Sequence, residues 1–401
     1  MPDILPVDRG ENSYMMEPLR IGQDSRFRET LNDLALVLVQ KSTAFRHSMP
    51  LSLTASLADL VRSMNCYYSN FIEGHQTHPI DIERALRKDY SQDPATRSLQ
   101  REAEAHIAVQ EWIDSGSLPG STAVTAKSVL ELHRRFCALL PEDLLWVEDP
   151  DTKDRVRVLP GEFRTRDVRV GRHIPVSPGA LPRFLQRFEE VYSSAGKAEF
   201  ILSCAAAHHR LLWLHPFLDG NGRVARLMSH AMLLTALDTG GVWSVARGLA
   251  RSVVTYKRLL AECDLPRRND LDGRGALSEE ALGEFTQYFL ATCIDQVTFM
   301  ENLVQPDRLR ARIRLWAEEE NRLGHLPAKA GAILEAILFR GELPRQDVRI
   351  ITNTGERQAA RISSALLSSG VLTSENSNSP LRLVFSAALA PRWLPGLFPE
   401  Q

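Results

Sequence analysis

Cysteine is scarce in this sequence, and so are the features of secreted, strongly basic and membrane-spanning proteins. The chain has five cysteines in 401 residues, an odd number with no CxxC spacing, which argues against disulfides and favours reduced, mostly buried thiols. Its formal net charge is -2, so no global basic field attracts nucleic acid or a membrane surface. No apolar amino-terminal stretch is typical of a signal peptide, and no run approaches the roughly 18 apolar residues of a membrane span. These absences predict a cytoplasmic enzyme or regulator without a membrane partner.

Most of the sequence has apolar residues at helical spacing, which predicts a mainly α protein without internal repeats. Residues 1–25 are polar and contain proline, and we expect them to form a loose arm. Residues 141–180 are rich in proline and glycine, and the alternating run 168–170 before Gly171 predicts a β-hairpin. The predicted helices cover residues 26–44, 51–72, 80–90, 99–113, 125–139, 181–192, 198–214, 223–237, 251–262, 278–303 and 307–323.

The carboxy-terminal residues have the order of elements that is typical of a winged-helix-like α+β domain. Helices are predicted over 328–339, 344–348 and 354–369, and a hairpin over 371–373 and 381–385. From 325 to 401 the chain holds eight Lys or Arg and six Asp or Glu, a weak basic footprint for a DNA-binding domain. Protein recognition or formation of a homodimer is therefore the favoured use of this domain, and DNA binding is the alternative.

The most specific feature of the sequence is a run of twelve residues that joins a histidine to two arginines. The buried helix predicted over residues 198–214 delivers His215 to a turn, where one imidazole nitrogen can face a cleft. The ordinary pKa of histidine, about 6.5, suits this group to take a proton from a hydroxyl. Phe217 is expected to point into the core and fix the loop. The run reads His215-Pro216-Phe217-Leu218-Asp219-Gly220-Asn221-Gly222-Arg223-Val224-Ala225-Arg226.

The second half of this run is a candidate phosphate site. The Gly-Asn-Gly sequence of residues 220–222 stands at a helix start, where backbone N–H groups and the helix dipole favour an anion. Arg223 and Arg226 lie one turn apart on one helix face, so each can hold a phosphate with its planar fork of donors. Asp219 is placed beside them, and Mg²⁺ prefers carboxylate and phosphate oxygens together. The run therefore predicts a site where a hydroxyl attacks a phosphorus atom of a nucleotide.

Residues 215–226 resemble the motif of the Fic family of nucleotidyl transferases, His-x-Phe-x-Asp/Glu-Gly-Asn-Gly-Arg-x-x-Arg, at every position. In that family the histidine deprotonates a Ser, Thr or Tyr hydroxyl of a target protein, which attacks the α-phosphate of ATP. AMP is transferred and pyrophosphate leaves. The resemblance implies a Fic helical core and this set of roles: His215 as the base, Asp219 as the ligand of Mg²⁺ or Mn²⁺, Asn221 and the amides around Gly220 and Gly222 at the α-phosphate, and Arg223 and Arg226 at the β- and γ-phosphates.

Two other stretches resemble the family. Residues 161–175 are similar to the segment that contains the flap, a hairpin that pairs with the target peptide as an added strand. An ordinary surface hairpin is the alternative. Tyr256 follows Thr255 where many members have a Tyr-Tyr pair near the adenine, so Tyr256 is expected at the nucleotide, while the remaining base pocket stays open. The flap residues implied by the resemblance are Val168, Arg169, Val170, Gly171, Arg172 and His173.

Upstream, residues 69–74 resemble the autoinhibitory motif Ser/Thr-x-x-x-Glu-Gly/Asn of Fic proteins, with Ser69, Glu73 and Gly74 at its defined positions. A solvated helix end is the plain alternative for such a short pattern. The resemblance implies that Glu73 pairs with Arg226 and removes the partner of the γ-phosphate. In some Fic proteins this glutamate instead orients a water molecule that removes AMP from a modified target.

The whole chain is thus predicted to be a protein adenylyltransferase that acts with ATP on a protein hydroxyl and is inhibited by Glu73. Removal of AMP at the same site is one alternative, and a DNA-binding regulator with a nucleotide-sensing core is another. The expected division is an amino-terminal helical region with the inhibitory motif (1–115), a Fic catalytic core (116–305), a linker helix (306–325) and the winged-helix-like domain (326–401).

Overall fold

Apolar spacing predicted most of the helices correctly in the computed structural model, which describes residues 6–148, 153–194 and 196–399. The chain is mainly helical, with small antiparallel sheets. The helices are α1 (Arg28–His47), α2 (Leu51–Ile72), α3 (Pro79–Leu86), α4 (Pro94–Trp112), α5 (Gly120–Ala123), α6 (Ala126–Ala138), α7 (Leu181–Ser193), α8 (Lys197–Leu214), α9 (Asn221–Leu237), α10 (Ala246–Arg251), α11 (Val253–Cys263), α12 (Glu279–Val304), α13 (Pro306–Arg322), α14 (Ala330–Arg340), α15 (Asp347–Thr352), α16 (Glu356–Ser368) and α17 (Ala390–Trp393). Shorter turns of helix are η1 (Ser13–Met16), η2 (Ile113–Ser117), η3 (Glu142–Leu145) and η4 (Pro178–Ala180).

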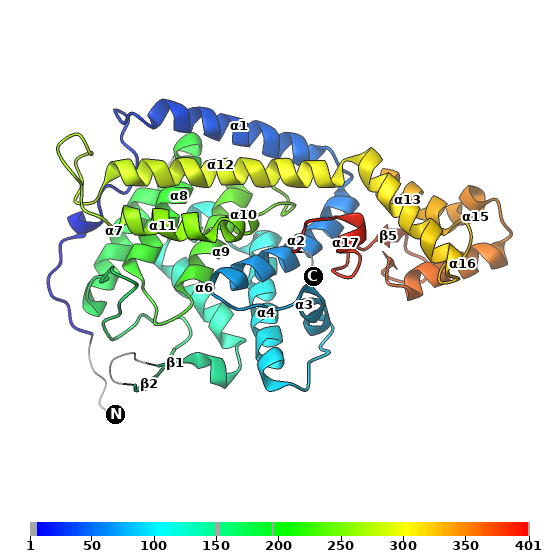
Figure 1. The fold of residues 1–401 in the computed structure, drawn as a ribbon, viewed down its shortest axis with the longest axis horizontal. Helices are drawn as coiled ribbons and strands as arrows, with labels where there is room; N and C mark the ends of the chain where they lie inside the picture. Colours follow the sequence, from blue (N-terminus) through cyan, green and yellow to red (C-terminus); the bar gives the residue numbers. More distant parts are fainter. Residues whose placement is uncertain (1–5, 149–152, 195, 400–401) are drawn as a thin grey trace.

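Helices α8 and α9 pack against each other at the centre of the fold and carry the predicted motif in the loop between them. Both are buried around most of their circumference, as expected of helices that are apolar on all sides. Helix α1 lies along α12 and covers the core from one side, while α2 and α4 lie on another (Figure 1). The loop at 215–220 is therefore held by two helices that cannot move without opening the core.

The amino-terminal residues are not a loose arm over the part that the structure describes. Met16 and Leu19 are fully buried, and the Arg210 guanidinium donates to the Pro18 carbonyl at 2.9–3.1 Å. The carboxylate of Glu11 accepts hydrogen bonds from the backbone and hydroxyl of Ser177, both at 2.7 Å. A few apolar residues and one carboxylate thus hold this segment on the core. The prediction of a loose arm was wrong because it rested on the overall polar composition of the segment.

The proline-rich middle segment contains one two-stranded hairpin that alternation did not predict and, at the predicted place, a tight turn around Gly171. Strands β1 (Trp146–Glu148) and β2 (Arg155–Arg157) pair in antiparallel register, with Val147 opposite Val156. The predicted hairpin around Gly171 is reduced to a single bridge between Val170 and His173. The backbone carbonyls of Arg166 and Val176, on either side of this turn, accept hydrogen bonds from a buried arginine that is described below.

Three helices and a three-stranded sheet make up the carboxy-terminal part, at the far end of the molecule from β1 and β2 (Figure 1). The strands are β3 (Glu342–Leu343), β4 (Leu372–Thr373) and β5 (Leu381–Leu383), in the order β3-β5-β4. The order of elements agrees with the predicted plan except for β3, which is too short to be recognised by its pattern. The short helix expected at 344–348 begins three residues later, as α15.

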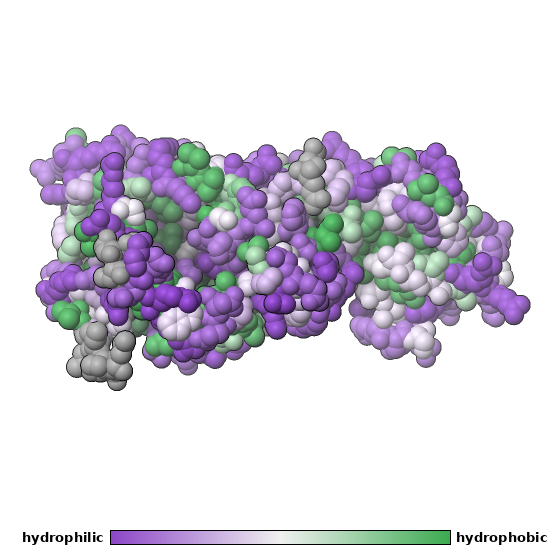
Figure 2. Space-filling model, turned by 60° about the horizontal axis from the view of Figure 1, so that its bottom comes forward, coloured by the Kyte–Doolittle hydropathy of each residue, from purple (hydrophilic) through white to green (hydrophobic). Residues whose placement is uncertain are grey.

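The last described residues return to the core. Trp393 packs edge-on against Trp316 of α13 at 5.2 Å between ring centroids, and the Tyr68 hydroxyl of α2 donates to the Leu397 carbonyl at 3.1 Å. The carboxy-terminal part is therefore tied to α2. No helix in the described ranges is long and apolar enough to cross a membrane. On the face drawn in Figure 2, hydrophilic residues predominate and hydrophobic residues form separate patches.

Several histidines are buried in the uncharged form, which predicts sensitivity to acid. Burial lowers their pKa to about 3 in His106 and His208, and to about 4 in His133, His209 and His215. The unfolded chain binds protons at these groups below about pH 6.5, whereas the folded chain does not until about pH 4. Each histidine therefore lowers the free energy of unfolding by about 1.4 kcal/mol per pH unit as the pH falls through this window.

We expect the melting temperature, followed by circular dichroism, to fall steeply as the pH is lowered from about 6.5 to about 4. Within the described residues neither ring nitrogen of His106 has a hydrogen-bond partner, so His106→Leu should make the fall shallower without loss of a bond. Replacing the exposed His47 with Gln is the matched control and should leave the slope unchanged. A melting temperature that is constant from pH 7 to pH 4.5 would contradict the burial of neutral histidines.

Candidate active site

The loop between α8 and α9 gives His215 an unusual backbone conformation. His215 follows the last turn of α8 in the left-handed region, with φ 46° and ψ 60°, and its N–H donates to the Leu211 carbonyl at 3.1 Å. Non-glycine residues rarely adopt this conformation, which is costly unless the surroundings fix it. The chain reverses here, and Gly220, with φ +81°, ends the loop as the residue before α9.

The imidazole of His215 is half-buried and uncharged at neutral pH. Burial, and next the nearby charge of Arg164, lower its pKa to about 4. Its Nδ1 is buried and has no hydrogen-bond partner among the described residues. A neutral ring with a free nitrogen can accept a proton, as the sequence predicted, although the low pKa makes it a weaker base than an exposed histidine.

Arg164 fixes the histidine and was assigned no role by the sequence analysis. This arginine is almost completely buried, and its Nε donates to the His215 carbonyl at 2.8 Å. Its two terminal nitrogens donate to the carbonyls of Arg166, at 2.9 Å, and Val176, at 2.5 Å. One guanidinium thus joins the left-handed turn at His215 to both ends of the segment 166–176. No local pattern marks this role, because all the acceptors are backbone atoms.

Two side chains support the loop from below. The ring of His133 stacks on Phe217 with centroids 3.8 Å apart, and its Nδ1 accepts a hydrogen bond from the Gly161 amide at 3.0 Å. Phe217 is fully buried, as predicted. A Cβ on Gly220 would lie only 3.4 Å from the His133 ring, in a backbone conformation that already favours glycine.

Asn221 closes the loop through its side chain. Its amide nitrogen donates to the Phe217 carbonyl at 2.9 Å, and its amide oxygen accepts from the Phe217 N–H at 3.0 Å. One N–H and the oxygen of this amide are therefore bonded within the loop, while the second N–H takes no part in these bonds, and the contact of Asn221 with a phosphate stays a prediction. The anion site includes the backbone amides of the first turn of α9, whose N–H groups have no partner inside the helix.

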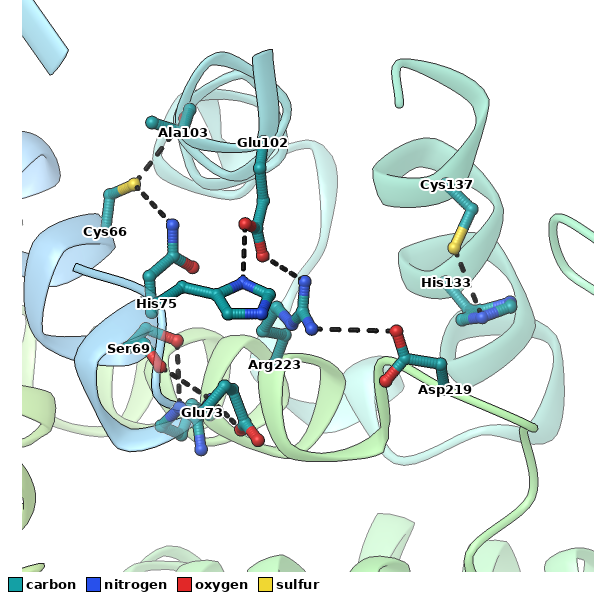
Figure 3. Close-up of polar contacts among 12 residues, drawn as sticks. Cys66, Ser69, Glu73, His75, Glu102, Ala103, His133, Cys137, Asp219 and Arg223 are labelled. Carbon is teal, nitrogen blue, oxygen red and sulfur yellow. Dashed lines mark hydrogen bonds and ion pairs between the residues drawn. The ribbon is translucent and has the colours of Figure 1, made fainter. Parts of the chain in front are cut away.

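Glu73 lies on this helix start and binds Arg226. An Nη of Arg226 donates to Glu73 Oε1 at 2.5 Å, and the same guanidinium binds Ser69 through its hydroxyl, at 2.8 Å, and its carbonyl, at 3.1 Å (Figure 3). The side chains of Ser69 and Glu73 thus both contact Arg226. Glu73 and Arg226 are 153 residues apart in the sequence. Gly74, with φ +91°, ends α2 directly after the glutamate.

The Glu73 carboxylate occupies the place where an anion would bind. A Cβ added to Gly222 would overlap Glu73 Oε1, so this oxygen rests on the backbone of the first turn of α9. Burial favours the neutral acid, but the charge and hydrogen bond of Arg226 outweigh it, and the pKa of Glu73 lies below its ordinary value. A charged carboxylate is therefore held at the helix start and against an arginine, as a phosphate would be.

Arg223 also has a carboxylate partner, which the sequence analysis did not identify. Its Nη1 forms an ion pair with Glu102 of α4, and its Nη2 lies 3.7 Å from Asp219 Oδ2. His75, one residue after Gly74, contacts the other oxygen of Glu102 through Nδ1 at 2.7 Å (Figure 3). Glu102 lies in the middle of an ordinary helix, so nothing in its local sequence connects it to the arginine.

Asp219 could hold a metal ion only if water molecules or a bound nucleotide supplied the other oxygen donors. Its side chain is 47% exposed, and no group of three or more His, Cys, Asp or Glu that could hold a metal occurs among the described residues. One exposed carboxylate beside an anion site fits Mg²⁺, which keeps water ligands and shares phosphate oxygens with a bound nucleotide.

The predicted flap residues and Tyr256 lie near this loop but differ in exposure. Arg169, Val170, Gly171 and Arg172 are exposed and Val168 is half-buried, whereas the His173 ring contacts the Trp213 carbonyl at 2.7 Å. Tyr256 is buried, and its hydroxyl is 2.6 Å from Nε2 of the buried His208, so its ring belongs to the core. The contact of Tyr256 with the adenine stays a prediction.

Sequence comparison identifies one family over the loop and its supporting helices. Residues 123–233 match the Fic/DOC family. The chain is 32% identical over 172 residues to protein adenylyltransferase Fic of Drosophila willistoni and 33% identical over 172 residues to that of Drosophila melanogaster. These matches cover 42% of this chain and 31% and 32% of the two relatives. The matched region thus spans about a third of the length of the relatives.

The fold is similar to solved structures of the same family. A Fic family protein from Desulfovibrio desulfuricans G20 has a TM-score of 0.52 at 15% identity, over 91% of this chain and 98% of that chain. A fragment of Fic-1 from C. elegans has a TM-score of 0.51 at 18% identity, over 69% of this chain and 73% of that chain. At these identities the similarity is one of fold.

Proposed function

Since residues 123–233 make this chain a Fic family protein, we propose that it transfers AMP from ATP to a Ser, Thr or Tyr hydroxyl of a protein, and that Glu73 holds it inactive. The name of the Drosophila relatives, protein adenylyltransferase, supports the activity. The position of the Glu73 carboxylate on the first turn of α9 and against Arg226 is the observation that carries the proposal.

In the proposed reaction His215 takes the proton of the attacking hydroxyl. Its neutral ring makes this transfer available at pH 7, and Arg164 holds the turn that aims it. The hydroxyl oxygen forms a bond to the α-phosphorus, and the bond from this phosphorus to the oxygen that bridges to the β-phosphorus breaks. Pyrophosphate leaves with the negative charge, which Arg223 and Arg226 stabilise.

The backbone amides of residues 220–222 are proposed to hold the α-phosphate, and the Asn221 side chain keeps that loop closed. Asp219 would hold Mg²⁺ or Mn²⁺, which neutralises charge on the phosphates when it is bound. The target peptide would pair with the exposed backbone around Val170 and Gly171, beside the loop that carries His215.

Inhibition follows from the position of Glu73. Its carboxylate takes the hydrogen bonds of Arg226 that the γ-phosphate needs, and it places a negative charge where the phosphate must lie. ATP that binds in spite of this charge would have its α-phosphate displaced from in-line attack. The Glu73 side chain is 30% exposed, so it can move into solvent when α2 shifts.

The transferred group is tested by the position of the label in ATP. We expect the Glu73→Gly variant with Mg²⁺ to raise the labelling of lysate protein above that of lysate alone with α-labelled ATP and not with γ-labelled ATP, because AMP carries only the α-phosphate. Chelation of divalent cations by EDTA should abolish the labelling. An increase over lysate alone with γ-labelled ATP would indicate a kinase and would contradict the proposal.

A further inference from the structure

The two arginines of the site have carboxylate partners of different kinds. Arg226 pairs with Glu73, which stands at the end of a helix and has a side chain that is 30% exposed. Arg223 pairs with Glu102, whose side chain is 1% exposed and lies within helix α4. The Glu73 side chain can move into water. Separating Glu102 from Arg223 would instead leave a carboxylate and a guanidinium buried without a partner, which is strongly unfavourable.

Both oxygens of Glu102 are used. Oε1 accepts from Nη1 of Arg223, and Oε2 contacts Nδ1 of His75 at 2.7 Å (Figure 3). The guanidinium also lies over the ring of Phe136, 5.1 Å from its centroid. These contacts hold Arg223 from one side, and its remaining Nη2 points toward Asp219 and the loop, 3.7 Å from Oδ2.

We propose that Glu102 is a positioning residue that acts through Arg223, and that it is not a second inhibitory carboxylate. It fixes the guanidinium so that Nη2 is presented to the β-phosphate of ATP, and His75 keeps the carboxylate from turning. The inference rests on the proposed function. It assigns the two carboxylates opposite effects: loss of Glu73 activates, whereas loss of Glu102 weakens recognition of the phosphates beyond the α-phosphate.

The test compares the binding of ATP and AMP by isothermal titration calorimetry in the Glu73→Gly background, in which the site is free. Glu102→Gln should weaken ATP binding at least about tenfold, the usual effect of a charged hydrogen bond, and leave AMP binding within about twofold. AMP is the control ligand because it lacks the β-phosphate. Glu104→Gln is the matched control variant, since Glu104 lies on the same helix but pairs with Lys88 and Tyr90 at the surface.

Two results would overturn the inference: a ratio of ATP to AMP affinity that is unchanged, whether or not both affinities fall, or a gain in AMP transfer when Glu102→Gln is made in the otherwise native chain. If the Glu73→Gly variant itself binds ATP no more tightly than AMP, the proposed function fails and not only the role of Glu102.

A second pair of variants covers the case in which Glu102→Gln folds poorly because Arg223 is left buried without a partner. Arg223→Gln should reduce the preference for ATP over AMP, and Arg223→Gln with Glu102→Gln leaves no lone buried charge. Because Glu102 acts through Arg223, the double variant should have the same ATP affinity as Arg223→Gln, within about twofold. A further loss of ATP affinity in the double variant would contradict the inference.

Discussion

Replacing Glu73 with glycine should raise the rate of AMP transfer at least about tenfold. This factor corresponds to an activation free energy lower by about 1.4 kcal/mol, which is at the low end of the contribution of a partly buried charge pair. The carboxylate leaves the first turn of α9, and Arg226 becomes available to the γ-phosphate. The measurement is the initial rate of incorporation from α-labelled ATP into protein of a cell lysate, at equal enzyme concentration.

Two further variants separate charge from side-chain volume. Glu73→Gln keeps the shape but removes the negative charge, so it should activate less than glycine. Glu142→Gly is the matched control, because Glu142 pairs with Arg157 at the surface and its loss should leave the rate unchanged. Equal rates for Glu73→Gly and the native chain would count against inhibition by this glutamate.

Replacing His215 with alanine in the Glu73→Gly chain should lower AMP transfer at least about a hundredfold, the range expected for loss of a general base. ATP affinity should stay within about twofold, since the phosphates are bound by the helix start and the arginines and not by the imidazole. The two quantities are measured by label incorporation and by calorimetry. His47→Ala, at an exposed position, is the control for loss of a histidine.

This pair of readouts distinguishes chemistry from folding. A variant that fails to fold loses ATP binding together with transfer, whereas loss of the base removes transfer alone. If the His215→Ala variant retained turnover, another group would have to remove the proton, and the assignment of His215 would be wrong.

The sequence predicted the parts of the fold that depend on local spacing. Apolar residues at helical intervals placed α8 and α9, and their junction placed the loop from His215 to Gly220. The meeting of Glu73 with Arg226 came only from a resemblance, because no local pattern joins residues 153 positions apart. The structure places both in contact, and the effect of that contact on activity stays a prediction.

The missed residues share one physical property: their partners are distant, or are backbone atoms. Arg164 binds carbonyls of the flap segment and of His215, and Glu102 reaches Arg223 from the middle of α4. The turn predicted after residues 168–170 is present, but its arms pair only at Val170 and His173, and alternation of side chains did not indicate how far they pair. The amide of Asn221 closes the loop on Phe217, a role that the motif did not reveal, and its contact with a phosphate stays a prediction.

The most direct test of the account is mass spectrometry of protein from a lysate incubated with ATP and Mg²⁺ and one of three purified chains: native, Glu73→Gly, and Glu73→Gly with His215→Ala. The account predicts an adenylyl group on a Ser, Thr or Tyr side chain with Glu73→Gly, little of it with the native chain, and none with the double variant. Adducts of equal abundance with all three chains, or no adduct with Glu73→Gly, would contradict a transferase that Glu73 inhibits and His215 drives.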